Sequence, residues 1–265
     1  MKGPIGVFDS GLGGLTVARA IWRQVPQEPV LYLGDTAHLP YGTKSSQRVQ
    51  ALSVKNVEFL QRKKVKMIVV ACNTASALAL DMLKHRFKLP ILGVIEPGAR
   101  RAALQTKNRR IGVIGTPATI RSGAYERHIR RLCPGAIIFS QACPLFVPLV
   151  EEGWTDNEVA RRTARTYLGP LKKRGIDTLV LGCTHYPHLK KTLSRVMGRG
   201  VVLVDSAEET AKEVKTLLVQ QGLARRPGPR AGHGFYVTDV PEAFYRQAKV
   251  FLGARVDRVH QAVIE

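Results

Sequence analysis

The sequence predicts an α/β protein with two pseudo-symmetric lobes, each a mainly parallel sheet flanked by helices. Apolar segments of strand length alternate with amphipathic segments of helix length, which is typical of parallel sheets covered by helices. The pattern then restarts, because residues 110–116 resemble residues 4–10. In addition, Cys72 and Cys183 each follow an apolar run that ends in a small residue. These observations indicate a duplicated arrangement.

The first half contains four continuous apolar runs, as expected of strands buried on both faces. The expected strands are residues 5–8, 30–33, 67–71 and 90–94. The segments between them carry apolar residues at helical spacing. The expected helices run from the glycines at 11–14 to about Val25, from 45 to 63 and from 74 to 86. Residues 34–42 are expected to form a loop.

The second half repeats the order of strand, helix, strand, loop, helix and strand. Its expected strands are residues 110–116, 137–139, 178–181 and 201–204, with a loop at 143–151 and a helix at 154–173. The last part has no third copy of the repeat. It should contain a helix at 207–221, a Pro/Gly/Arg-rich loop at 225–234, a strand at 235–238 and a helix at 241–252.

The repeat predicts a division into two lobes with a cleft between them that holds the active site. We expect residues 1–96 and 208–265 to form the first lobe, because the last segment should pack back on it. Residues 97–207 should form the second lobe.

Composition restricts the class of protein. The chain has 265 residues, 45% of them hydrophobic, which is enough for a sizeable core. No apolar run approaches the roughly 20 residues of a membrane helix, and the N-terminus lacks the form of a signal peptide. We therefore expect a cytoplasmic protein with four reduced cysteines rather than a disulfide framework. Cys133 and Cys143 are expected to be structural.

The formal net charge of +21 is unusual. Such a charge can indicate binding to nucleic acid or another polyanion. The basic pairs, however, are spread along the whole chain, as at Arg109–Arg110, Arg161–Arg162 and Arg225–Arg226. No basic tail, zinc-finger spacing or aromatic RNA-recognition motif accompanies them. A solvated basic surface is the simpler interpretation, nonspecific polyanion binding is the alternative, and a positive field would also attract a small anionic substrate.

Asp9 and Ser10 follow the first strand and precede a glycine-rich helix start. The glycines do not fit the dinucleotide-binding pattern, because Thr16 occupies its last position. A helix N-terminus can nevertheless bind a carboxylate through its N–H groups. Asp9 could equally be a simple helix cap.

The two repeated cysteines are the strongest candidates for chemistry. Cys72 precedes Asn73 and Thr74, and Cys183 precedes Thr184 and His185. A nearby helix N-terminus favours the reactive thiolate. Either cysteine alone could be a small buried apolar residue, but matched positions in two repeats favour function. A zinc site would need ligands beyond Cys183 and His185 at suitable spacing, and we expect no metal. His185 suits a general acid or base.

Taken together, these motifs resemble the glutamate racemases of the aspartate/glutamate racemase superfamily. The resemblance extends from residue 5 to about 210. It rests on GVFDSGLGGLT at 6–16, GDTA at 34–37 with PYG at 40–42, ACNTAS at 71–76, GTPATI at 115–120, PLVE at 148–151, GCTHYP at 182–187 and DSA at 205–207. His38 stands where arginine is more usual, and residues 222–234 fall outside the motifs.

The resemblance implies cofactor-independent interconversion of L- and D-glutamate. One thiolate would remove the α-proton and the other thiol would return a proton to the opposite face. Cys72 and Cys183 match the two catalytic cysteines, with Asp9 assisting Cys72 and with His185 and Glu151 assisting Cys183. Glu152 is adjacent, so the assisting carboxylate is ambiguous by one residue. The positions that match substrate contacts are Asp9, Ser10, Tyr41, Gly42, Asn73, Thr74, Thr116, Thr119, Thr184 and His185.

The same likeness implies a homodimer that supplies D-glutamate for peptidoglycan synthesis. A racemase of aspartate, of another amino acid or of hydantoins shares the paired cysteines and remains an alternative. A nucleic-acid-binding protein is the alternative from a different class.

Overall fold

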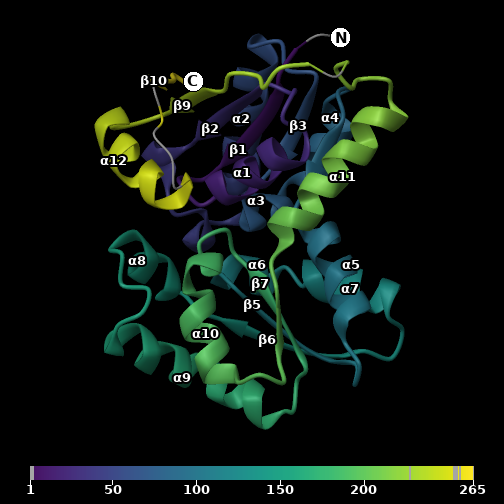
Figure 1. The fold of residues 1–265 in the computed structure, drawn as a ribbon, viewed down its shortest axis with the longest axis vertical. Coiled ribbons are helices and arrows are strands. Elements are labelled where there is room, and N and C mark those ends of the chain that lie inside the picture. The colour runs from purple at the N-terminus through teal and green to yellow at the C-terminus, as the bar shows by residue number, and fades with distance from the viewer. Residues whose placement is uncertain (1–2, 227, 253–255, 257, 265) are drawn as a thin grey trace. The chain divides into compact units, whose positions relative to one another are not determined.

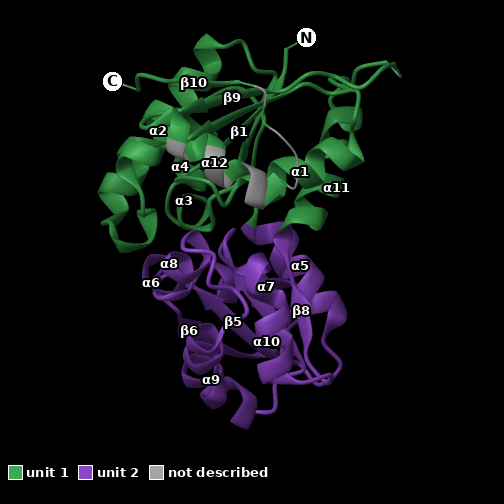
Figure 2. Cartoon of the chain, turned by 60° about the vertical axis from the view of Figure 1, so that its left-hand side comes forward, with its two compact units in different colours: residues 1–94, 207–265 green, residues 95–206 purple. Residues whose placement is uncertain are grey.

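The computed structural model describes residues 3–226, 228–252, 256 and 258–264. The chain divides into two compact units, which are residues 1–94 with 207–265 and residues 95–206 (Figure 2). The outermost residues of the expected first lobe, 1–2 and 265, lie outside the described residues. Each unit contains a parallel sheet with helices beside it (Figure 1), which confirms the predicted fold class.

The sheet of the first unit has the strand order β10-β9-β2-β1-β3-β4. Its strands are β1 (Ile5–Asp9), β2 (Val30–Gly34), β3 (Met67–Val70), β4 (Ile91–Gly93), β9 (Gly234–Val237) and β10 (Val259–Gln261). Every pairing between neighbours in this sheet is parallel. The C-terminal strand β9 pairs with β2, so residues far apart in sequence complete one sheet.

Helices connect these strands, as parallel pairing requires. In the first unit they are α1 (Leu15–Gln24), α2 (Ser46–Arg62), α3 (Asn73–Leu78), α4 (Leu80–Arg86), α11 (Ser206–Gln220) and α12 (Pro241–Leu252). Two short 3₁₀ helices, η1 (Thr36–His38) and η2 (Tyr41–Thr43), lie in the loop after β2. The strands β1 and β3 are buried along their whole length, as their uninterrupted apolar sequences predict.

The sheet of the second unit has the order β6-β5-β7-β8 and is also parallel. Its strands are β5 (Arg110–Gly115), β6 (Ile137–Ala142), β7 (Thr178–Gly182) and β8 (Val202–Val204). Its helices are α5 (Ile95–Gln105), α6 (Pro117–Arg121), α7 (Ala124–Leu132), α8 (Phe146–Glu151), α9 (Glu158–Lys173) and α10 (Lys190–Met197), with η3 at Tyr186–Leu189.

The two sheets share one topology. In the first unit the first strand, β1, lies between the second and the third, in the order β2-β1-β3-β4. In the second unit the corresponding order is β6-β5-β7-β8. In each sheet, the second strand lies on one side of the first strand and the third strand lies on its other side. The point at which the strand order switches is therefore between β1 and β3 in one sheet and between β5 and β7 in the other. Open α/β sheets bind ligands at the carboxyl ends of the strands at such a switch point.

Apart from the helix expected at 154–173, which begins only at Glu158 after its Asn157 cap, two expected elements differ from the structure. The single helix expected at 74–86 is two helices separated at Ala79, whose φ of −122° lies outside the helical range. The side chain of Gln50 on α2 donates to the Leu78 carbonyl at 2.9 Å, next to this break. Second, the loop expected at 143–151 contains α8. Pro148 is compatible with this helix because it lies in the first turn, where the backbone N–H has no helical partner.

None of the helices in the part of the chain that the structure describes has the length and apolar character needed to cross a bilayer.

Candidate active site

The expected site residues cluster at the carboxyl ends of the switch-point strands within each unit. Asp9 ends β1, and Cys72 follows β3 by two residues. Thr116 follows β5 directly, and Cys183 follows β7 directly. Because β1 pairs with β3 and β5 with β7, each thiol lies next to the first strand of its own sheet. The polar groups of each unit thus gather where such sheets bind ligands.

Cys72 caps the N-terminus of α3. Its sulfur accepts a hydrogen bond from the Ala75 N–H at 3.5 Å, and its thiol donates to Ser10 Oγ at 3.8 Å. The side chain is buried, with 5% of its surface exposed. A sulfur held by a backbone N–H at the start of a helix is in a setting that favours negative charge.

Asp9 is buried beneath the start of α1. Its Oδ2 accepts a hydrogen bond from the Gly11 N–H at 3.0 Å. A Cβ at Gly14 would lie 2.5 Å from the Asp9 Cβ, closer than such atoms approach. Gly14 is therefore required for close packing of the α1 N-terminus against Asp9. The alternative that Asp9 is a helix cap does not hold, since the cap residue of α1 is Gly14 and no side chain forms a cap hydrogen bond there.

A buried hydrogen-bond network holds Tyr41 in the loop after β2. The Tyr41 hydroxyl donates to Asp35 Oδ2 at 2.5 Å and accepts from Asn56 Nδ2 at 3.0 Å. Asp35 Oδ1 also contacts His38 Nδ1 at 2.8 Å and accepts from the Thr238 hydroxyl at 2.9 Å. Burial and then the charge of Asp35 raise the pKa of Tyr41 far above its ordinary value, so its phenol remains a neutral donor.

Asp35 and Asn56 are buried hydrogen-bond partners of the expected site residue Tyr41 to which the sequence pattern alone gave no role. Asp35 lies in a recognised motif but received no role, and Asn56 lies on α2, which has no motif. The signal that could have identified Asn56 is a polar residue on the buried face of an amphipathic helix, since such a group must have a hydrogen-bond partner.

The other expected residues of the first unit lie beside these groups. Gly42 is buried in η2 next to Tyr41. Asn73 and Thr74 are buried in the first turn of α3, directly after Cys72. Their polar atoms therefore lie at the same edge of the sheet as Asp9 and Ser10.

In the second unit, Thr116 caps α6. Its Oγ1 accepts from the Thr119 N–H at 3.2 Å and lies 3.0 Å from the Thr119 hydroxyl. Pro117 occupies the first position of the helix, where its missing N–H has no consequence. Cap and proline together place two hydroxyl groups at the carboxyl end of β5.

Cys183, His185 and Glu151 form a chain of contacts. The Cys183 sulfur lies 3.8 Å from His185 Nδ1, and His185 Nε2 lies 3.3 Å from Glu151 Oε1. Cys183 and His185 are both buried, whereas Glu151, at the end of α8, is 30% exposed. Glu152 is exposed and begins the turn after the helix. The structure therefore brings Glu151, and not Glu152, to the imidazole.

The two thiols differ in their immediate partners. Cys183 is followed by a turn and then by the 3₁₀ helix η3, so the α-helix N-terminus expected next to it is absent from this position. Cys72 has a backbone N–H within 3.5 Å, whereas the Cys183 sulfur lies 3.8 Å from an imidazole nitrogen. The two sulfurs at equivalent positions of the repeat therefore have different partners, a backbone N–H for Cys72 and an imidazole for Cys183. Thr184 is buried beside Cys183 and occupies the position equivalent to Asn73.

Cys143 and Tyr186 lie behind Cys183. The Tyr186 hydroxyl donates to the Cys143 carbonyl at 2.9 Å, and its ring packs edge-on against Phe146. Burial, with a smaller effect of Cys183, raises the pKa of the Cys143 thiol well above its ordinary value. Cys143 is therefore a neutral packing residue. All four cysteines are free.

Among the described residues, no group of three or more His, Cys, Asp or Glu side chains is arranged to hold a metal ion.

Comparison with known proteins places this geometry in a family. The model of the Asp/Glu/hydantoin racemase family matches residues 5–214. The glutamate racemase of Geobacter metallireducens is 53% identical over 98% of this chain and 97% of its own length. The crystal structure of a glutamate racemase isoform from Bacillus anthracis has a TM-score of 0.95 and 41% identity, and covers 100% of this chain and 99% of that one.

A third relative was solved with a ligand. The glutamate racemase of Francisella tularensis, in complex with D-glutamate, has a TM-score of 0.92 and 35% identity and covers 100% of this chain and 98% of its own. Matches of this extent cover both units and all the positions described above. The chain belongs to the Asp/Glu/hydantoin racemase family and, within it, to the glutamate racemases.

Proposed function

We propose that this protein interconverts L- and D-glutamate without a cofactor, using Cys72 and Cys183 as its two bases. Membership of the family supports the reaction, and the relative from Francisella tularensis binds D-glutamate. The observation that carries the two-base proposal is the equivalence of the cysteines, each of which follows the third strand of a sheet with the same topology.

In the proposed reaction, the thiolate of one cysteine removes the α-proton of glutamate and leaves its electron pair on the α-carbon. The thiol of the other cysteine then donates its proton to the opposite face of that carbon. The first sulfur ends as a thiol and the second as a thiolate, so the protein is poised for the reverse reaction.

Different groups assist the two thiols. We propose that Asp9 assists Cys72, since Asp9 ends the strand that pairs with β3 and Ser10 lies within 3.8 Å of the sulfur. Cys183 would exchange its proton with help from His185, which is oriented by Glu151 through the 3.3 Å contact. Proton transfer by a positioned side chain typically accelerates a reaction by about 10²–10⁴-fold.

The carbanion requires stabilisation, because the α-proton of an amino acid is a very weak acid. Prearranged hydrogen-bond donors are the general means of stabilising such charge. The proposed substrate contacts supply hydroxyl, amide and backbone N–H groups for the carboxylates of glutamate. They are Asp9, Ser10, Tyr41, Gly42, Asn73, Thr74, Thr116, Thr119, Thr184 and His185.

The test uses purified protein without added pyridoxal phosphate, incubated with L-glutamate in D₂O. Optical rotation and the α-proton NMR signal are followed together. We expect rotation to decay to zero while solvent deuterium enters the α-position. Absence of exchange with both enantiomers would reject glutamate as the substrate. Aspartate and a hydantoin are assayed in parallel, because the family description includes them.

We further propose that the D-glutamate enters peptidoglycan synthesis in the cytoplasm. Expression of the chain should restore growth without added D-glutamate to a bacterial strain that requires it, and the C72S variant should not.

A homodimer is the proposed assembly. Sedimentation velocity should then give about twice the 29.2 kDa of one chain, whereas a single species of 29.2 kDa would refute the dimer.

A further inference from the structure

The basic loop between α11 and β9, defined here by its described residues 222–226 and 228–231, has no role in the proposed reaction. It contains Arg225, Arg226 and Arg230 and no acidic residue. All three arginines are exposed. Among the described residues, none of their guanidinium groups forms an ion pair, whereas several other arginines of the chain do. The loop thus presents three uncompensated positive charges.

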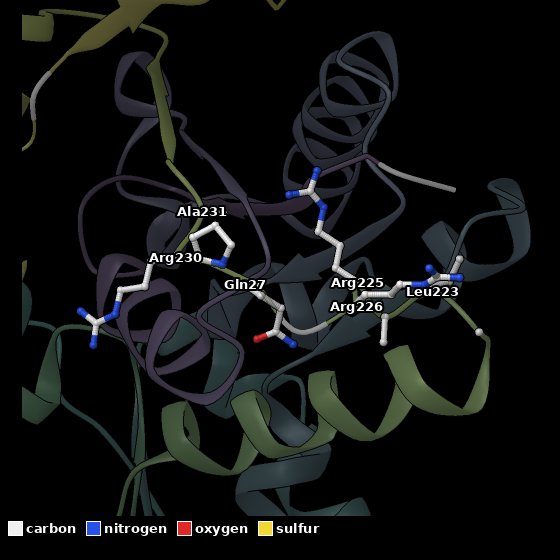
Figure 3. Close-up of a pocket in the computed structure, with 10 residues that line it drawn as sticks. Gln27, Leu223, Arg225, Arg226, Arg230 and Ala231 are labelled. Carbon is white, nitrogen blue, oxygen red and sulfur yellow. The ribbon is translucent and has the colours of Figure 1, made fainter.

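This loop lines a cavity of about 810 Å³ together with Gln27. Figure 3 shows Arg230 on one side of the loop and Arg225 and Arg226 on the other, with the Gln27 amide between them. The volume lies within the roughly 300–1,000 Å³ of typical small-molecule sites. In the view of Figure 3 the three guanidinium groups point in different directions rather than toward one point.

A buried ion pair holds the first part of the basic loop in place. The Lys66 ammonium lies 2.5 Å from Glu28 Oε2, and both side chains are fully buried. Lys66 Nζ also donates to the Leu223 carbonyl at 2.7 Å, and Glu28 Oε1 accepts from the Arg225 N–H at 2.7 Å. A buried pair is stabilising only when its remaining hydrogen-bonding capacity is used. Here that capacity fixes the backbone of the loop.

The far end of the basic loop is held as well. The Ala231 N–H donates to the Pro26 carbonyl at 3.0 Å. Two residues later, the His233 ring stacks on Trp22 with ring centroids 4.4 Å apart. The loop is therefore anchored on both sides of its arginines. Anchoring reduces the ordering entropy that a flexible loop would lose when a ligand binds.

The chemistry of this site favours phosphate. Guanidinium groups form paired, charge-assisted hydrogen bonds with phosphate oxygens. Three cations around one cavity match a ligand with more than one phosphate. The lining residues include no aromatic side chain, so the pocket offers no surface for stacking a nucleic-acid base. We propose that this pocket binds a small oligophosphate anion, that is, a ligand with two or more linked phosphate groups.

Isothermal titration calorimetry with orthophosphate, pyrophosphate and tripolyphosphate tests the proposal. We expect saturable one-to-one binding of pyrophosphate and tripolyphosphate, with orthophosphate weaker by about tenfold or more, since each tenfold is ~1.4 kcal/mol. The R225Q/R226Q/R230Q variant should weaken tripolyphosphate binding by at least about tenfold on the same scale.

A matched variant separates this pocket from the general field of the chain. R130Q/R162Q/R199Q removes the same charge from exposed arginines of the second unit. It should retain tripolyphosphate affinity within about twofold, a difference of ~0.4 kcal/mol. Three results would each overturn the proposal. They are an equal loss of tripolyphosphate affinity in both variants, the absence of saturable binding, and orthophosphate binding as tight as that of tripolyphosphate. Racemisation measured without phosphate should be unchanged in both variants, so this result is independent of the proposed reaction.

Discussion

Nε2 of His185 lies 3.3 Å from Oε1 of Glu151. The opposite nitrogen of the ring lies 3.8 Å from the Cys183 sulfur. The imidazole therefore links a partly exposed carboxylate to a buried thiol. A carboxylate in this position orients the ring, as in other histidine sites where the second nitrogen contacts an acid.

The first prediction concerns this carboxylate. Replacing Glu151 by Gln should lower kcat about 10- to 100-fold, below the 10²–10⁴-fold of a group that transfers the proton itself. Glu152→Gln is the matched control and should leave kcat unchanged, because Glu152 is exposed and adjacent in sequence. Equal loss in the two variants would remove Glu151 from its proposed role.

Variants of Glu151, His185 and Asp9 test which thiol each of these residues assists. The equilibrium constant of racemisation is 1, so kcat/KM must fall equally in both directions. Asymmetry has to appear in the primary isotope effect of α-deuterated substrate instead. For Glu151→Gln and His185→Asn, we expect the larger change with the enantiomer that Cys183 deprotonates, and for Asp9→Asn with the other one. Identical isotope effects with both enantiomers would contradict the division of roles.

The second prediction concerns the thiols. Cys72→Ser and Cys183→Ser should each lower racemisation by at least about 10³-fold, while circular dichroism remains unchanged. The double variant should be little worse than either single one, because residues that act as a unit are not additive. Cys133→Ser, at a half-buried position outside the site, should retain activity. Near-normal turnover in either single variant would exclude the two-base reaction.

The third prediction concerns the glycines after β1. A Cβ at Gly14 would lie 2.5 Å from the Asp9 Cβ and 3.0 Å from the Ala71 Cβ, whereas one at Gly11 would meet only Leu39 at 3.6 Å. Gly14→Ala should therefore displace Asp9 and destabilise the fold by about 1–3 kcal/mol, as overpacking does. Gly11→Ala should have a much smaller effect on both activity and unfolding. The measurements are kcat and urea unfolding of both variants, and equal effects would show that the packing of Gly14 on Asp9 is unimportant.

The features predictable from the sequence are those that local pattern determines. Buried parallel strands are continuous apolar runs, so the strands that precede Cys72 and Cys183 could be placed to within a residue or two. The repeat then predicted that both sulfurs follow equivalent strands. The Glu151 and Glu152 ambiguity could not be resolved in this way, because it depends on the phase of α8, a short helix whose internal proline, Pro148, suggested a loop.

Contacts between distant segments could not be predicted. Asp35 meets Thr238 across about 200 residues, and Lys66 meets Leu223 across more than 150. Both pairings bring the C-terminal segment, whose strand β9 pairs with β2, against the first part of the chain. No local periodicity encodes the partner of a buried polar group, only that one must exist. The break between α3 and α4, next to the Gln50 contact, is unpredictable for the same reason.

The fourth prediction follows from the buried carboxylate of Asp35. It accepts hydrogen bonds from Tyr41 and Thr238 and contacts His38, and none of its surface is exposed. Asp35→Asn should lower the free energy of unfolding by about 2–3 kcal/mol, because a hydrogen bond to a charged group contributes about 1.5–3 kcal/mol. Asp81→Asn, at an exposed position on α4, should change it by less than about 0.5 kcal/mol. Equal urea midpoints for the two variants would show that the network contributes nothing to stability.

The fifth prediction concerns the dependence of stability on pH. Burial lowers the pKa of His233 below its ordinary value of 6.5. Its Nδ1 accepts a hydrogen bond from the Val30 N–H at 3.3 Å, which only the neutral ring can do. Above pH 6.5 the ring is neutral in the folded and unfolded chains, and its contribution to stability is complete. As the pH falls below 6.5, the unfolded chain binds the proton first, so stability decreases until the folded pKa is passed.

The urea midpoint of the wild-type protein should therefore decrease between pH 7.5 and pH 5.5. His233→Gln should reduce this decrease, because its side chain does not titrate. His85→Gln is the matched control, since His85 is exposed on α4 and its ring nitrogen contacts the Asp81 carbonyl. It should retain the full pH dependence. If the urea midpoint of both variants changes with pH as in the wild-type protein, the imidazole of His233 is not the group that links folding to pH. If the pH dependence of the midpoint is lost only in His233→Gln, the linkage is assigned to the ring that stacks on Trp22.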